Sequence, residues 1–191
     1  MKSIIITASL LAVLATPLAA QQIPPTPEEL ALFEAAYAGK LVDVERLVAA
    51  GTSVDAVDAE SRTPMMFAAF NGHRQVVSFL LTRGANVDSK DISGRTGLMY
   101  ASSGPYVETV EVLLDAGAEV NIQGSLEGFT ALMTAAAEGQ VEIVRLLLER
   151  GADPTLKDVD GDTALSFAQQ EGHTAVVEIL EKSPAMGDDT K

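Results

Sequence analysis

Three methionines recur at one position of a periodic sequence and could together form a soft-metal site. Met66, Met99 and Met133 each follow a threonine by three residues, and thioether sulfur favours copper(I). A shared ion needs its donors within about 2–2.5 Å, whereas equivalent positions on neighbouring helices lie about 8–10 Å apart. We therefore expect these side chains to fill the core. Metal or redox handling by a stress-related accessory protein that uses these methionines is the alternative function.

Other catalytic chemistry finds little support in the sequence. His73 and His173 are the only two histidines and belong to different periods of the sequence, and the chain has no cysteine. Acidic residues such as Glu108, Glu111 and Glu142 recur at positions typical of a solvated helix face. No glycine-rich phosphate loop and no nucleophile elbow is present. We expect no enzyme activity, no cofactor and no metal site.

Charge and composition narrow the class of partner. The 191 residues are 47% hydrophobic and 21% charged, which is typical of a globular protein. Twenty-seven acidic residues against thirteen basic ones give a net charge of −14. Such a chain repels the phosphate backbone and anionic lipid surfaces. We therefore expect no nucleic-acid partner, and no membrane association unless an N-terminal apolar segment is retained.

The N-terminal segment resembles a secretory signal. Residues 1–20 combine an early lysine, an uncharged apolar run and small residues after Pro17. The apolar run is shorter than the roughly twenty residues of a spanning helix. We expect cleavage after Ala20 and export, with a periplasmic location. An uncleaved inner-membrane anchor is the alternative. The proline-rich residues 21–29 are expected to form an extended linker.

From Leu30 onward the chain repeats itself every 33 or 34 residues. Each later block opens with a threonine suited to cap a helix and continues, after a turn, with apolar residues at helical spacing. In all of these blocks but that of the third repeat, a glycine ends the first helix. A polar, turn-rich loop follows. The predicted repeats cover residues 30–58, 59–91, 92–125, 126–158 and 159–182, followed by a disordered tail at 183–191.

These blocks, such as "TPMMFAAFNGHRQVVSFLLTRGANVD" from Thr63, resemble the ankyrin repeat. The resemblance implies an all-α solenoid of stacked helix-turn-helix units with projecting β-hairpin-like loops. The first block is expected to lack the opening Thr-Pro. Pro105 and Tyr106 replace Gly-His in the third repeat, and the loop before Thr130 carries one extra residue.

The resemblance also implies a monomeric, non-catalytic module that binds another protein through its concave face and hairpin tips. Three consecutive tips carry apolar residues where solvent is expected, and these could instead pack on one another. Phe67, Tyr100 and Phe167 are expected to be framework residues that only pack. The candidate partner-binding residues lie at the tips, just before the threonines, or seven to eight residues after them: Phe70, Asn71, Ile92, Arg95, Leu126, Phe129, Glu138 and Val159.

Overall fold

The computed structural model describes residues 24–183. The predicted signal segment at 1–20, residues 21–23 of the predicted linker, and residues 184–191 of the predicted tail lie outside the described residues. The expectations for them stay predictions.

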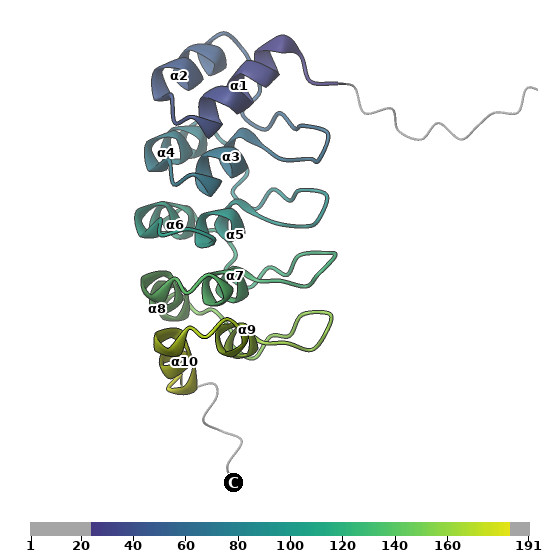
Figure 1. Ribbon diagram of the computed structural model, residues 1–191. Helices are drawn as coiled ribbons and strands as arrows, with labels where there is room; N and C mark the ends of the chain where they lie inside the picture. The colour runs from purple at the N-terminus through teal and green to yellow at the C-terminus, as the bar shows by residue number, and fades with distance from the viewer. Residues whose placement is uncertain (1–23, 184–191) are drawn as a thin grey trace, which may run out of the picture.

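Ten α-helices in the described part of the chain form five successive helix-turn-helix units (Figure 1). The units stack in chain order, and each unit contributes one first helix and one second helix. The helices are α1 (Pro27–Tyr37), α2 (Leu41–Ala49), α3 (Pro64–Phe70), α4 (Arg74–Thr82), α5 (Gly97–Ser102), α6 (Val107–Asp115), α7 (Ala131–Ala137), α8 (Val141–Glu149), α9 (Ala164–Gln170) and α10 (Thr174–Glu181).

The helices form two layers that run the length of the stack. The first helices α1, α3, α5, α7 and α9 contact one another in succession, and the second helices do the same. Loops between units project side by side from the first-helix layer (Figure 1). These loops form no strand between residues 24 and 183; they are turns closed by backbone bonds such as Asp91 N–H to the Arg95 carbonyl at 3.0 Å. The expected all-α solenoid is confirmed.

The periodic threonines begin the first helices. The side-chain oxygens of Thr63, Thr96 and Thr130 accept the backbone N–H three residues later, at 3.1–3.4 Å. Each hydroxyl satisfies a donor that would otherwise have no partner at the start of a helix. Thr163 caps α9 in the same way. One local rule therefore sets the start of each first helix from the second unit onward.

The first unit differs from expectation at its start. Helix α1 begins at Pro27, so residues 27–29 are helical and do not belong to an extended linker. The Thr26 side chain caps this helix, and the Glu29 carboxylate accepts a hydrogen bond from the Thr26 N–H at 2.7 Å. The first unit therefore does open with Thr-Pro. Helix α1 has 11 residues against 7 in α3, so a search at a fixed repeat spacing misses this threonine.

Glycines at the ends of the first helices let neighbouring units approach closely. Gly39 has φ of +67°, and a Cβ there would lie 2.5 Å from Nδ1 of His73. The His73 Nε2 donates to the Tyr37 carbonyl at 2.9 Å, which ties the second unit to the first. Tyr106 takes the place of this histidine in the third unit and lies against Gly72. The predicted departure at Pro105 and Tyr106 thus leaves the stacking intact.

Two rows of small and branched apolar side chains form one continuous core. The first helices contribute buried alanines, and the second helices contribute buried Val and Leu such as Val76, Val77 and Leu80. Buried area at these positions comes from neighbouring units as well as from the same unit, as in other stacked repeats. Among residues 24–183, no helix has the length and apolar character needed to cross a membrane.

Candidate functional site

An open groove of about 240 Å³ lies on the first-helix side of the stack and is lined by residues of the second to fifth units. Its walls are two edge-to-face aromatic pairs, Phe70 with Tyr100 at 6.1 Å and Phe129 with Phe167 at 5.1 Å between ring centroids. The remaining lining residues form its base and edges: Arg95, Met99, Ser103, Met133, Thr134, Ala137 and Glu138. The groove is therefore mainly apolar, with one basic and one acidic side chain.

A missing aromatic ring creates this groove. The fourth residue after each repeat threonine is Phe67, Tyr100, Thr134 and Phe167 in successive units. Three of these units present a ring at this position, whereas the fourth presents the small Thr134 side chain, which turns back to donate to the Thr130 carbonyl at 3.0 Å. The neighbouring rings pair edge to face on either side, Phe70 with Tyr100 and Phe129 with Phe167, and the space beside Thr134 stays open.

Tyr100 and Phe167 pack against the core, as expected, and they also line the groove. Phe67 packs there too, and Phe67 and Tyr100 line a second hollow. The sequence does carry a signal for this role, which is the change from an aromatic residue to Thr134 at one repeat position. The opening that this change leaves becomes visible only when neighbouring units are placed side by side.

The second hollow, of about 170 Å³, lies on the same layer toward the N-terminus. Tyr37, Arg62, Met66 and Phe67 line it together with the Phe70–Tyr100 pair. This aromatic pair therefore separates two hollows. Phe70, which lines both hollows, is 45% exposed, and Tyr37, which lines only the second hollow, is 52% exposed.

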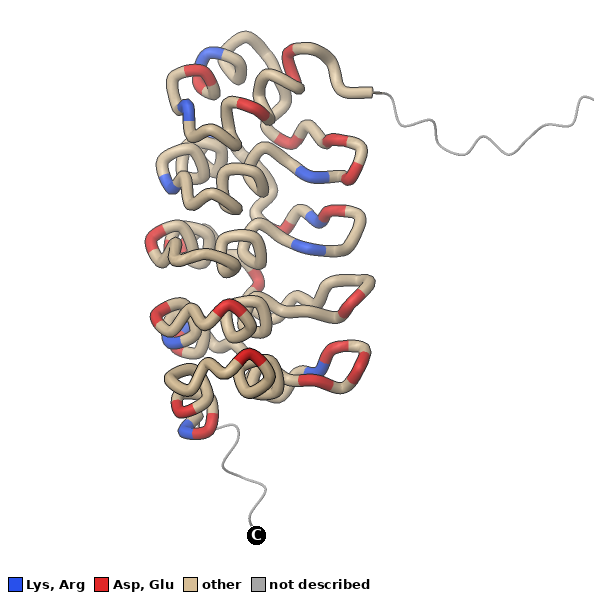
Figure 2. The backbone as a smooth tube through the Cα atoms, in the orientation of Figure 1, with Lys and Arg blue, Asp and Glu red and all other residues tan. Residues whose placement is uncertain are grey.

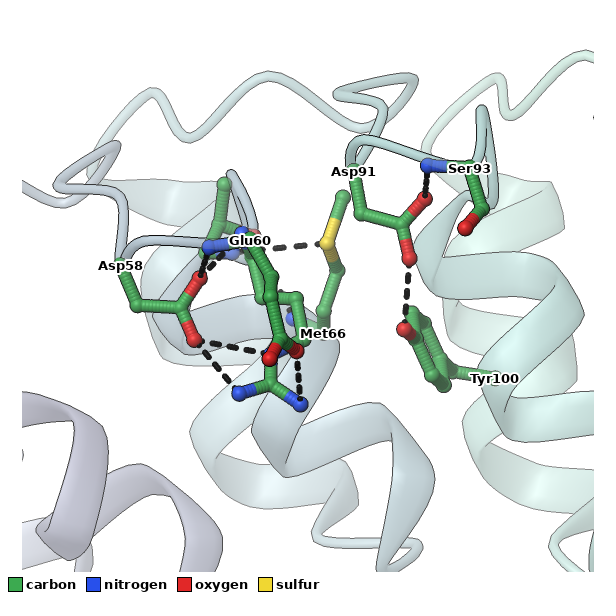
Figure 3. Close-up of polar contacts among 8 residues, drawn as sticks. Asp58, Glu60, Met66, Asp91, Ser93 and Tyr100 are labelled. Carbon is green, nitrogen blue, oxygen red and sulfur yellow. Dashed lines mark hydrogen bonds and ion pairs between the residues drawn. The ribbon is translucent and has the colours of Figure 1, made fainter. Parts of the chain in front are cut away.

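The Asp91 side chain accepts three hydrogen bonds in the loop beside the groove, and Figure 3 shows those from Ser93 and Tyr100. Asp91 is 9% exposed, and its carboxylate accepts bonds from the backbone N–H of Ser93 and of Arg95, both at 2.8 Å. The Tyr100 hydroxyl donates to the same carboxylate at 2.7 Å. Burial of the ring, and then the bond to Asp91, raise the pKa of Tyr100 above its ordinary value. The tyrosine stays a neutral donor and holds the groove wall in place.

The arginine side chains at the bases of two loops, Arg62 and Arg95, form ion pairs with acidic residues. Arg95 donates to Glu127 of the next loop at 2.8 Å, and this bond raises the pKa of the guanidinium. Arg62 pairs with Asp58 at 2.7 Å and with Glu60 at 2.8 Å. Figure 3 shows Asp58 and Glu60 converging in this way. The positive charges nearest the hollows are thus already compensated.

The hairpin tips are joined through the backbone while their apolar side chains remain exposed. The N–H of Ile92 donates to the Glu60 carbonyl at 2.9 Å, and Val159 N–H donates to the Glu127 carbonyl at 3.1 Å. The side chains of Ile92, Leu126 and Val159 are nevertheless 62%, 63% and 69% exposed. Contact between tips therefore does not bury these three residues.

Half of the eight candidate residues come together in the groove, namely Phe70, Arg95, Phe129 and Glu138. The three apolar tip residues form a separate row on the projecting loops. Asn71 lies outside the groove, and its amide donates to the Tyr37 carbonyl of the preceding unit at 2.9 Å. The side-chain amide of Asn71 is thus engaged in joining the first two units.

Negative charge dominates the first-helix side of the stack. Figure 2 shows acidic residues along the loops and at the ends of the first helices, with fewer basic residues beside them. Glu138 and Glu171 are the C-cap residues of α7 and α9, and both are exposed. The carbonyl ends of helices carry partial negative charge, which adds to that of the carboxylates.

The methionines suit packing. Met66, Met99 and Met133 are only 1–3% exposed. The Met66 sulfur accepts the Thr63 N–H at 3.4 Å and completes a helix cap (Figure 3). Within residues 24–183, no group of three or more His, Cys, Asp or Glu residues is placed to hold a metal ion.

Comparison with protein families agrees with the repeat architecture. The family model described as ankyrin repeats (3 copies) matches residues 32–124 and residues 121–189. No curated protein matches the chain. The two matched segments together span most of the sequence and cover all five units at least in part. The chain therefore belongs to the ankyrin-repeat family.

Proposed function

We propose that this protein is a non-catalytic scaffold that binds another protein through the first-helix side of the stack. Ankyrin repeats are generally protein–protein interaction modules. The binding surface consists of the aromatic-walled groove and the row of exposed tip residues Ile92, Leu126 and Val159. Aromatic residues, Met and Arg are enriched in the cores of protein interfaces, and this surface offers all three.

The observation that carries the proposal is that the groove and the row of exposed apolar tip residues lie on the same loops of the first-helix side. Phe129 and Arg95 lie at the bases of the loops and line the groove, and Leu126 and Ile92 lie further along the same loops. Polar groups surround this surface, including the Arg95–Glu127 pair, in which the two side chains are 42% and 50% exposed. An apolar centre with a polar rim is the usual anatomy of a binding surface.

Site-specific photocrosslinking in the native compartment tests the proposal. We expect a crosslinkable residue at Leu126 or Glu138 to capture the same partner protein. The matched control is Val42 on α2, which is 76% exposed and belongs to the second-helix layer. Equal capture from Val42, or no capture from Leu126 and Glu138, would contradict the proposal.

A second test uses serine in place of the three tip residues. The substitutions Ile92→Ser, Leu126→Ser and Val159→Ser remove apolar area that is more than 60% exposed, so they leave the core intact. We expect the triple variant to keep its circular dichroism spectrum and to lose capture of the partner by a crosslinkable residue at Glu138. Val42→Ser should leave crosslinking unchanged.

We further propose that the scaffold acts after export, because residues 1–20 have the composition of a secretory signal. Mass spectrometry of the protein from its native host should show a mature chain that begins at Gln21. An intact N-terminus that fractionates with the inner membrane would instead support the anchored alternative.

A further inference from the structure

We propose that the groove receives one large apolar side chain of a partner segment that carries Lys or Arg directly beside this residue. The inference rests on the proposed scaffold function and specifies the chemistry of the partner. The partner segment is thus a cationic stretch of another protein with a single Leu-like or aromatic anchor.

The size of the groove favours a single side chain. Sites for drug-sized molecules usually measure about 300–1,000 Å³, whereas an apolar cavity of about 150 Å³ accepts benzene. The groove of about 240 Å³ lies between these values. Its open side faces solvent, and two aromatic pairs form opposite walls. Met99 and Met133 lie at the base, where flexible thioethers adapt to the shape of an inserted group.

The charges around the groove favour a cationic segment. Arg95, the basic lining residue, is bound to Glu127 at 2.8 Å. Glu138 lines the groove and is exposed at the C-terminal end of α7, and Glu171 has the same place at the end of the adjacent α9. A lysine or arginine on either side of the anchor would meet these carboxylates. Such pairing speeds association and selects against acidic partners.

A second copy of this chain is disfavoured by the same charges. Each copy carries a net charge of −14, so two acidic surfaces would face each other across the groove. The tip residues of one copy offer apolar side chains, but Leu126 is followed by Glu127, and Val159 by Asp160. These neighbours have the wrong sign for Glu138 and Glu171.

Methyl NMR of the ¹³C-methionine-labelled protein tests the proposal with defined probe peptides. The probe is acetyl-Lys-Lys-Leu-Lys-Lys-amide, and the controls replace Leu with Gly or every Lys with Glu. We expect the probe to shift the Met99 and Met133 methyl signals, which line the groove. The methyl signal of Met65, which is 1% exposed and lines neither hollow, serves as an internal control.

The expected affinity changes separate the apolar and electrostatic contributions. The Gly peptide should bind about 10- to 100-fold more weakly, as follows from losing one buried aliphatic side chain. Raising the salt from about 0.1 M to about 1 M shortens the Debye length from roughly 10 Å to roughly 3 Å, and should weaken the Leu peptide several-fold. Tighter binding of the Glu peptide would overturn the charge argument.

Two variants place the binding in the groove. Thr134→Phe restores the missing ring and should abolish the methyl shifts, whereas Thr134→Ser should preserve them. Glu138→Gln changes an exposed residue, so it tests the charge contribution without threatening the fold. It should weaken the Lys-containing peptide and reduce its salt dependence. Unchanged binding to both Thr134→Phe and Glu138→Gln would overturn the inference.

The results also distinguish this inference from the scaffold proposal. If crosslinking at Leu126 and Glu138 captures a partner while the Leu peptide causes no methyl shift, the groove inference fails and the scaffold proposal stands. If neither occurs, both fail. Concentration-dependent dimers in sedimentation velocity that Thr134→Phe abolishes would assign the groove to a second copy and refute the cationic partner.

Discussion

Tyr100→Phe removes one hydroxyl from the wall of the groove and tests the structure at a single bond. The hydroxyl donates to Asp91 at 2.7 Å. Phenylalanine fits this position, because Phe67 and Phe167 occupy it in the second and fifth units. The substitution therefore deletes the hydrogen bond without removing the ring.

The expected loss of stability follows from the environment of Asp91. Hydrogen bonds to charged groups contribute about 1.5–3 kcal/mol. Asp91 is only 9% exposed, but its carboxylate keeps two backbone donors in the variant. We therefore expect the low end of this range, about 1.5 kcal/mol. With a urea m-value of about 2 kcal/mol/M, the unfolding midpoint should fall by about 0.75 M. The melting temperature should fall by about 3–6 °C.

The pH dependence of the same bond has a definite sign. The folded protein raises the pKa of Tyr100, so the fold favours the neutral tyrosine. This contribution to stability is fully present below the ordinary tyrosine pKa of about 10 and is lost as the pH rises toward the folded-state pKa. Wild type should therefore lose stability above pH 10 more steeply than Tyr100→Phe. Absorbance titration should show one late-titrating tyrosine that is missing from the variant.

A double-mutant cycle with Asp91→Asn decides whether the bond is the cause. Coupled residues show interaction energies of about 0.5–3 kcal/mol, whereas independent ones add. Circular dichroism and tyrosine fluorescence should report the same transition if the array still unfolds as one unit. Different midpoints would mean that weakening a middle unit has broken the cooperativity of the repeat array. Strict additivity, or a titration without the late tyrosine, would refute the assigned role of Asp91.

Three further substitutions test the stack itself. In Gly72→Ala the alanine must adopt φ of +69° and its Cβ meets the Tyr106 ring, whereas in Gly172→Ala it must adopt φ of +77° with open space around its Cβ. Urea unfolding should therefore show a greater loss of stability for Gly72→Ala. Equal losses of stability in the two variants would contradict the contact between Gly72 and Tyr106. Thr130→Ala removes the cap of α7 and should cost about 0.5–2 kcal/mol, whereas an unchanged urea midpoint would show that the cap adds nothing. Arg74→Gln breaks an exposed pair with Glu108 at 3.0 Å and should change the free energy of unfolding by less than about 1 kcal/mol.

The repeat architecture could be predicted because its determinants are local. A threonine cap, a glycine with positive φ and apolar residues at helical spacing recur within each block, so the second to fifth units were placed from sequence alone. The start of the first unit was predicted wrongly. Its cap at Thr26 was missed because α1 is longer than the other first helices, which displaces the threonine from the common spacing.

The candidate site was only partly predictable. Phe70, Arg95, Phe129 and Glu138 were selected by repeat position and do line one groove. Tyr100 and Phe167 pack against the core, as their repeat position predicts, but they also line this groove, and the bond from the Asn71 amide to the Tyr37 carbonyl could not be foreseen. The position of a residue within its repeat predicts the layer in which its side chain lies, but it does not predict which residue of the neighbouring unit that side chain contacts.

The sequence by itself determined the order of the helices, their caps and the acidic character of the surface, since each depends on residue type and short-range spacing. Only the tertiary structure decided that Thr134 leaves an opening between two aromatic pairs. That opening depends on distances between side chains of different units. Its size is set both by the rings that are present and by the ring that is absent at Thr134. Packing of neighbouring units sets those distances, and no single repeat encodes them.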